Sequence, residues 1–160
     1  MATLVGTQKQ MTDLLHQLIE LDYDAIEAYR AAIARLEDGG DRAQLAMFMA
    51  DHERHVRDLT STLTGLGQKA PGGADLKQVL TKGKVVLAAL VGDRAILRAM
   101  KSNEDDTNTA YERAFRRTDL PSHLRTLIEK NLADERRHRA WLETRLGVEA
   151  PDSSLRPTQR

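Results

Sequence analysis

Proline is confined to four positions in this chain of 160 residues, and the long stretches between them are rich in Ala, Leu, Arg and Glu. These residue types favour helix, and no six-residue segment alternates apolar with polar side chains as a half-buried strand does. The prolines and clustered glycines fall at intervals that divide the chain into four long segments. We therefore expect an all-α protein.

Two short connections and one long one separate the predicted helices. The helices are expected over residues 8–37, 41–66, 93–117 and from a cap at Asp119 or Ser122 to residue 146, with a short helix over 76–90 in the long connection. Short connections join antiparallel neighbours, and a long one allows a crossover. The pattern predicts an antiparallel four-helix bundle made of two helical hairpins joined by a crossover.

This bundle is expected to be one domain, because the chain is long enough for one and short for two. The domain spans residues 10–146. We expect a flexible N-terminus at residues 1–9 and a disordered tail at residues 147–160, where two prolines and polar residues follow the last glycine.

Charge and cysteine content exclude several kinds of function. The 24 basic residues balance 24 acidic ones, so net charge gives no reason to bind nucleic acid or an anionic membrane. The absence of cysteine excludes disulfides, thiolate metal sites, iron–sulfur clusters and a cysteine nucleophile. The longest apolar run, residues 85–91, is too short to span a bilayer, and residues 1–10 lack a signal-peptide pattern. We expect a cytoplasmic protein with neither nucleic-acid nor membrane partners.

Each predicted helix carries an apolar stripe that is interrupted near its middle by side chains able to bind a metal. The interrupting residues, in chain order, are Asp22, His52, His55, Glu104, Glu135 and His138. Burying an unpaired carboxylate costs several kcal/mol. Six such groups at inward positions of four helices therefore indicate a shared partner.

The positions of these residues along the helices place them in one layer. Asp22 precedes Gly39 in the first turn by nearly the same stretch of chain as that by which His55 follows it. At the rise of an α-helix, both lie about 25 Å from that turn. Glu104 and Glu135 are equally far from the second turn, so we expect one polar layer across the bundle.

The interruptions also repeat along the chain. Asp22 and Tyr29 recur with the same spacing as Glu104 and Tyr111. The segment MADHERH at 49–55 recurs, at nearly the same offset, as LADERRH at 132–138. This repeat predicts an internal duplication of a helical hairpin.

The residues that repeat resemble the ferritin-like superfamily of di-metal carboxylate bundles, over about residues 10–146. In that superfamily the first and third helices each supply a carboxylate with a tyrosine two turns later, and the second and fourth supply Glu-x-x-His. The segments AYRAAI and AYERAF, and the Leu-Pro that opens the last helix, resemble a bacterial ferritin-like family of unknown function.

The resemblance implies a metal site and its residues. One or two iron, manganese or zinc ions would be bound by the six interrupting residues, with Tyr29 and Tyr111 behind them. If iron occupies the site, open coordination positions would allow oxygen or peroxide chemistry, and a stress-related role would follow. No substrate is indicated.

Two of the six residues depart from the superfamily pattern. His52 stands where a glutamate is usual, and Asp22 is one methylene shorter than glutamate. Three carboxylates instead of four leave a two-ion site about one negative charge short, which argues against a full di-iron centre. A site richer in histidine favours zinc or a single ion. Asp51, one position off the stripe, is a candidate substitute ligand.

One alternative interpretation of the function remains open at this point. The bundle could be a non-enzymatic structural or stress-associated protein with a degraded site, in which the three acids pair with the three histidines. Trp141 and the pair Met47 and Met49 are expected to be packing residues or contacts of a homodimer.

Overall fold

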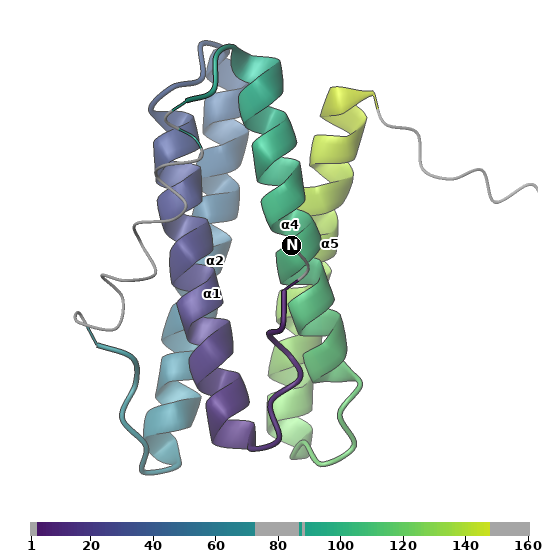
Figure 1. Ribbon diagram of the computed structural model, residues 1–160. Helices are drawn as coiled ribbons and strands as arrows, with labels where there is room; N and C mark the ends of the chain where they lie inside the picture. Colours follow the sequence, from purple (N-terminus) through teal and green to yellow (C-terminus); the bar gives the residue numbers. More distant parts are fainter. Residues whose placement is uncertain (1–2, 73–86, 88, 148–160) are drawn as a thin grey trace, which may run out of the picture.

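Four long α-helices form most of the computed structural model, which describes residues 3–72, 87 and 89–147 (Figure 1). They are α1 (Met11–Ile33), α2 (Gly39–Gly65), α4 (Asp93–Phe115) and α5 (Ser122–Leu146). α1 and α2 form one antiparallel hairpin and α4 and α5 another, and α2 ends at the opposite end of the bundle from the beginning of α4. The predicted all-α bundle of two hairpins is confirmed.

The structure does not test two of the predicted segments, because most of their residues lie outside the described ranges. The short helix expected over residues 76–90 lies mostly outside the described residues, and so does the tail after residue 147. None of the helices in the described part of the chain is apolar over a length that could cross a bilayer.

The connection between α1 and α2 differs from the prediction. α1 ends at Ile33, and α2 already begins at Gly39. The Asp38 side chain accepts a hydrogen bond from the backbone N–H of Asp41 at 2.8 Å, and so caps α2. Because this cap satisfies a donor of the first turn, Gly39 and Gly40 lie inside α2 and do not terminate α1.

The start of α5 was also predicted wrongly. Pro121 occupies the N-cap position, and no side chain caps the helix there. Proline fixes its own φ and lacks an N–H, so it suits the beginning of a helix without a side-chain cap. Ser122 is the first residue of the helix, and Asp119 instead pairs with Arg117.

In cross-section the four helices lie at the corners of a square, and each helix packs against two neighbours. α1 packs against α2 and α4, and α5 packs against α4 and α2. The hairpins therefore lie side by side, and one residue from each helix can reach the bundle axis at the same height (Figure 1).

The apolar core is divided into two clusters along the bundle axis. One cluster, at the end near the α4–α5 connection, includes Leu15, Leu59 and Ile128. The other, at the opposite end, includes Leu45, Leu97 and Leu142. All six residues are at most 4% exposed, so the two clusters shield the middle of the bundle from water at both ends.

The segment before α1 lies along α4. The backbone N–H of Thr3 donates to Asp106 Oδ1 at 3.3 Å, and Arg117 donates to the carbonyl of Lys9 at 3.0 Å. Arg113 also donates to the carbonyl of Thr3. The flexibility of residues 1–9 stays a prediction. Motion of this segment would have to break the contacts that it makes with α4.

Candidate metal centre

The six residues that interrupt the apolar stripes meet in the middle of the bundle. Each of them is 0% exposed, and they lie between the two apolar clusters. The structure therefore brings together every residue predicted for the layer: Asp22 from α1, His52 and His55 from α2, Glu104 from α4, and Glu135 and His138 from α5.

The layer contains two overlapping sets of potential ligands, here called half-sites. The first half-site consists of Asp22, His52, His55 and Glu135, and the second of His52, Glu104, Glu135 and His138. Within each half-site, one donor atom from every residue lies within 4.8 Å of the others. His52 and Glu135 belong to both half-sites and lie between them.

The two tyrosines cross from one hairpin to the other. Tyr111 of α4 donates to Asp22 Oδ2 at 2.5 Å, and Tyr29 of α1 donates to Glu104 Oε1. Each tyrosine thus orients the carboxylate of the opposite repeat. Burial and the neighbouring carboxylates raise the pKa of both phenols, so the hydroxyls keep their protons and act as donors.

Two aspartates orient the outer histidines. His55 Nε2 lies 3.2 Å from Asp134 Oδ2, and His138 Nε2 lies 3.0 Å from Asp51 Oδ2. These contacts turn the Nδ1 atoms inward: that of His55 is 3.3 Å from Glu135 Oε1. A histidine that ligates a metal commonly makes such an outer hydrogen bond to a carboxylate, which fixes its ring and raises its basicity.

The sequence interpretation missed this role of Asp51 and Asp134. The sequence suggests Asp51 as a substitute ligand, but Asp51 belongs to neither half-site and contacts the outer nitrogen of His138. The repeat held the signal, because an aspartate stands one helical turn before the last histidine in both MADHERH and LADERRH. The contacts cross between α2 and α5, so only the packing reveals the partners.

Two arginines complete this outer network. Arg137 donates to Asp51 at 2.5 Å and to Asp134 at 3.0 Å, and Arg54 pairs with the same two aspartates. Burial acts to raise the pKa of Asp51, but the hydrogen bonds from His138 and the arginines lower it well below its usual value. The carboxylates that hold the histidines therefore stay ionised.

The electrostatics of the inner residues are dominated by burial and by their opposite charges. Burial acts to raise the pKa of Asp22 and Glu104, but hydrogen bonds from the histidines lower both on balance. Burial acts to lower the pKa of His55, and its carboxylate partners raise it to about 10. For Glu135, burial prevails and the pKa is raised, with a further contribution from the charge of Glu104.

Several buried atoms of the layer lack a hydrogen-bond partner within the part of the chain that the structure describes. They are both carboxylate oxygens of Glu135, Nε2 of His52 and Nδ1 of His138. Three of the four lie 3.3–3.7 Å from an acid or histidine atom of the layer, but not with hydrogen-bond geometry. Buried polar groups are almost always paired, and each unpaired one costs free energy. All four atoms are metal-donor atoms that face the layer, so a cation between them would satisfy what the protein leaves unpaired.

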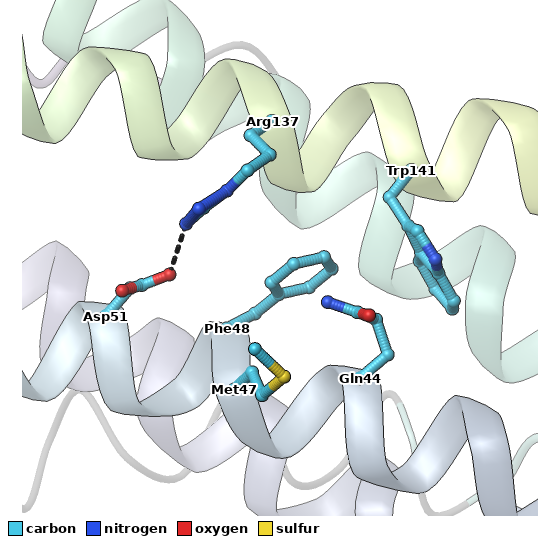
Figure 2. Close-up of a pocket in the computed structure, with 6 residues that line it drawn as sticks. All are labelled: Gln44, Met47, Phe48, Asp51, Arg137 and Trp141. Carbon is cyan, nitrogen blue, oxygen red and sulfur yellow. Dashed lines mark hydrogen bonds and ion pairs between the residues drawn. The ribbon is translucent and has the colours of Figure 1, made fainter.

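A pocket of about 330 Å³ lies on the outside of the layer, between α2 and α5. Figure 2 shows Phe48 and Trp141 at this pocket, with Arg137 reaching across to Asp51. The Phe48 ring also packs on His138, with 4.2 Å between ring centroids. The wall of the pocket thus includes two residues that contact His138. The ring centroids of Trp141 and Phe48 are 5.6 Å apart, so Trp141 packs against Phe48 as predicted.

Comparisons with known proteins place the chain in a family without supplying an activity. No curated protein and no solved structure matches it. A family model does match, over residues 10–117, which is more than half of the chain and ends before α5. The chain therefore belongs to the family described as Domain of unknown function (DUF2383).

Proposed function

We propose that this protein is a ferritin-like metal-binding bundle whose buried layer holds one or two transition-metal ions. The observation that carries the proposal is Glu135, whose two carboxylate oxygens are fully buried between the half-sites. In the described part of the chain Oε2 faces no donor, and Oε1 has only the contacts with His55 Nδ1 at 3.3 Å and His52 Nδ1 at 3.5 Å, which lack hydrogen-bond geometry. A buried carboxylate whose oxygens are incompletely hydrogen-bonded is costly, and coordination of a cation removes that cost.

The donor atoms fit a divalent ion of the iron, manganese or zinc type. Imidazole nitrogen and carboxylate oxygen suit all three metals, and the layer contains as many histidines as carboxylates. Asp22 and His55 would hold an ion on one side, Glu104 and His138 on the other, with Glu135 between them. Bound iron or manganese would supply redox chemistry toward dioxygen or peroxide, and zinc would supply Lewis acidity.

The residues around the ions have defined tasks in this proposal. The crossed tyrosines hold one oxygen of Asp22 and one of Glu104. The other oxygens, which contact His52 and Thr107 in the structure, would be the ones that bind a metal. Asp51 and Asp134 fix the histidine rings with Nδ1 inward. The apolar clusters above and below keep water from the layer.

Metal titration of the chelated protein tests the proposal. We expect uptake of zinc, manganese or ferrous iron by isothermal titration calorimetry, and loss of that uptake in the double variant His55→Ala/His138→Ala. The matched control is His16→Ala/His123→Ala, which removes two histidines outside the layer. No uptake by the wild type, or equal uptake by both double variants, would refute the proposal.

A second function is favoured by one contact. His52 Nδ1 lies 2.8 Å from Asp22 Oδ1, which is an ordinary hydrogen bond between an imidazole and a carboxylate. A metal-free structural or stress-associated bundle would use such acid–histidine pairs to close the layer. Melting separates the two functions, because a ligand at 100 times its Kd adds about 2.7 kcal/mol of stability. That gain raises the Tm by about 5–10 °C for a domain of this size, whereas the structural bundle would melt unchanged.

A further inference from the structure

Two asparagines form a second buried polar group beside the layer. Asn108 follows Glu104 by one helical turn on α4, and Asn131 precedes Glu135 by one turn on α5. Because α4 and α5 are antiparallel, both asparagines lie about 6 Å from the layer, toward the α4–α5 connection. Each of them is 0% exposed. The two amides are therefore buried at the same height on neighbouring helices.

The amide of Asn108 is held firmly by the backbone. Its Nδ2 donates to the carbonyl of Glu104 at 2.8 Å and to that of Glu135 at 2.9 Å. These two bonds use both amide hydrogens, so the nitrogen and the oxygen of the side chain cannot be exchanged. The remaining atom, Asn108 Oδ1, is buried and has no donor among the described residues.

The amide of Asn131 is held less firmly. Its Nδ2 donates to the hydroxyl oxygen of Tyr111 at 3.4 Å, and that hydroxyl donates to Asp22. Asn131 Oδ1 is also buried without a donor in the part of the chain that the structure describes. The terminal torsion of an asparagine is broad, and one long hydrogen bond restrains it weakly. A contact at Oδ1 would keep the amide directed at Tyr111.

A water molecule is the ligand that suits these two acceptors. Buried polar groups are almost always paired, and folded proteins contain about one buried water per 27 residues, each with about three hydrogen bonds. Water has two O–H groups, so one molecule can donate to both oxygens. A metal ion suits them poorly, because a hard cation needs more ligands than two neutral amide oxygens.

The first repeat has no such acceptors. Its corresponding positions are Ile26 and Phe48, which are apolar and at most 6% exposed. The Phe48 ring lies 6.3 Å from that of Tyr29, whereas Tyr111 receives a hydrogen bond from Asn131. The need for a donor therefore arises in the second repeat alone.

We propose that Asn108 and Asn131 bind one internal water molecule, which donates to both Oδ1 atoms and holds the Asn131 amide against Tyr111. The water thus connects the firmly held Asn108 to the phenol that orients Asp22. The site does not depend on the proposed metal function, because both amides are buried in the protein without an ion.

A high-resolution crystal structure of the wild type tests the site without any variant. We expect a water peak about 2.5–3.0 Å from both Oδ1 atoms. In solution, oxygen-17 relaxation dispersion counts long-lived internal waters and is insensitive to the exchange of hydroxyl protons. Asn108→Leu and Asn131→Leu should each lose about one such water, and the double variant should also lose about one, because the two residues share it. Thr126→Leu, an exposed replacement on α5, is the control and should lose none.

The effect on Asn131 is measured by NMR with nitrogen-15 asparagine. The chain contains only three asparagines, Asn103, Asn108 and Asn131, so their side-chain amides are easily assigned. In Asn108→Leu the side-chain amide resonances of Asn131 should shift and exchange faster with solvent, because the bridging water is lost. Those of Asn103, which is outside this group, should stay unchanged.

Three results would overturn the proposal: no water peak between the two Oδ1 atoms in the wild type, loss of two waters in the double variant, or unchanged Asn131 resonances in Asn108→Leu. None of them bears on metal uptake, so the proposed function would stand. Conversely, a wild type that binds no metal would leave the water site intact.

Discussion

The hydroxyl of Tyr111 provides a direct test of how the buried carboxylates are held. It donates to Asp22 Oδ2 at 2.5 Å, and both residues are 0% exposed. No other donor reaches Oδ2 in the part of the chain that the structure describes, since His52 and His55 both face Oδ1. Tyr111→Phe therefore removes the donor to one buried oxygen and leaves the ring in place.

The size of the effect follows from the burial of this contact. A hydrogen bond to a charged group contributes about 1.5–3 kcal/mol. Because Asp22 has no access to water, which could replace the lost donor, we expect the upper part of that range, about 2–3 kcal/mol. In a domain of this size each kcal/mol lowers the Tm by about 2–4 °C, so the Tm should fall by about 4–12 °C.

Urea denaturation and thermal melting of the metal-free protein, followed by circular dichroism, measure this loss. Tyr29→Phe is the counterpart in the other repeat and should have a similar effect, since Tyr29 donates to Glu104. Tyr23→Phe is the control, because Tyr23 is only partly buried on α1 and should cost less than about 0.5 kcal/mol. A Tyr111→Phe protein as stable as the Tyr23→Phe protein would contradict the reasoning.

Three further predictions concern the surroundings of the layer. Asp51→Asn and Asp134→Asn should each weaken zinc binding by about 10–100-fold in competition with a chromophoric chelator, and unchanged affinity would exclude their role in orienting the histidines. Phe48→Ala should lower the free energy of unfolding by about 3–5 kcal/mol in urea, because Phe48 is 2% exposed and packs on His138. Backbone hydrogen bonds from the α1–α2 connection lower the pKa of Asp93, so its contribution to stability is complete above the unfolded-state pKa of about 4 and is lost as the pH falls through the folded-state value. Wild type should therefore lose more stability than Asp93→Asn between about pH 6 and pH 3 in urea titrations, and equal losses would contradict this.

The helices and the polar layer could be predicted because both follow from local spacing. An apolar stripe at three- and four-residue steps defines the buried face of a helix, and Asp22 or Glu135 on that stripe must point inward. Counting residues from a turn then gives the height of each group along the bundle. The same stripes predict Tyr29 and Tyr111 in the core, where both are 0% exposed.

The crossed contacts could not be predicted, because they depend on how helices face one another. Asp51 is one residue off the stripe of α2, and its partner His138 is on α5. The same holds for the ring of His52, whose two nitrogens face different half-sites only once four helices are packed. The cap by Asp38 depends on a side-chain rotamer, and the sequence indicates the turn but not which residue begins α2.

Anomalous X-ray scattering from crystals grown with zinc or ferrous iron tests the central claim most directly. The account predicts one or two peaks at the metal's absorption edge within the layer, between Asp22, His55 and Glu135 or toward Glu104 and His138. Absence of any peak in the layer from metal-saturated crystals, or a peak only at the protein surface, would contradict the claim that these buried acids and histidines bind metal.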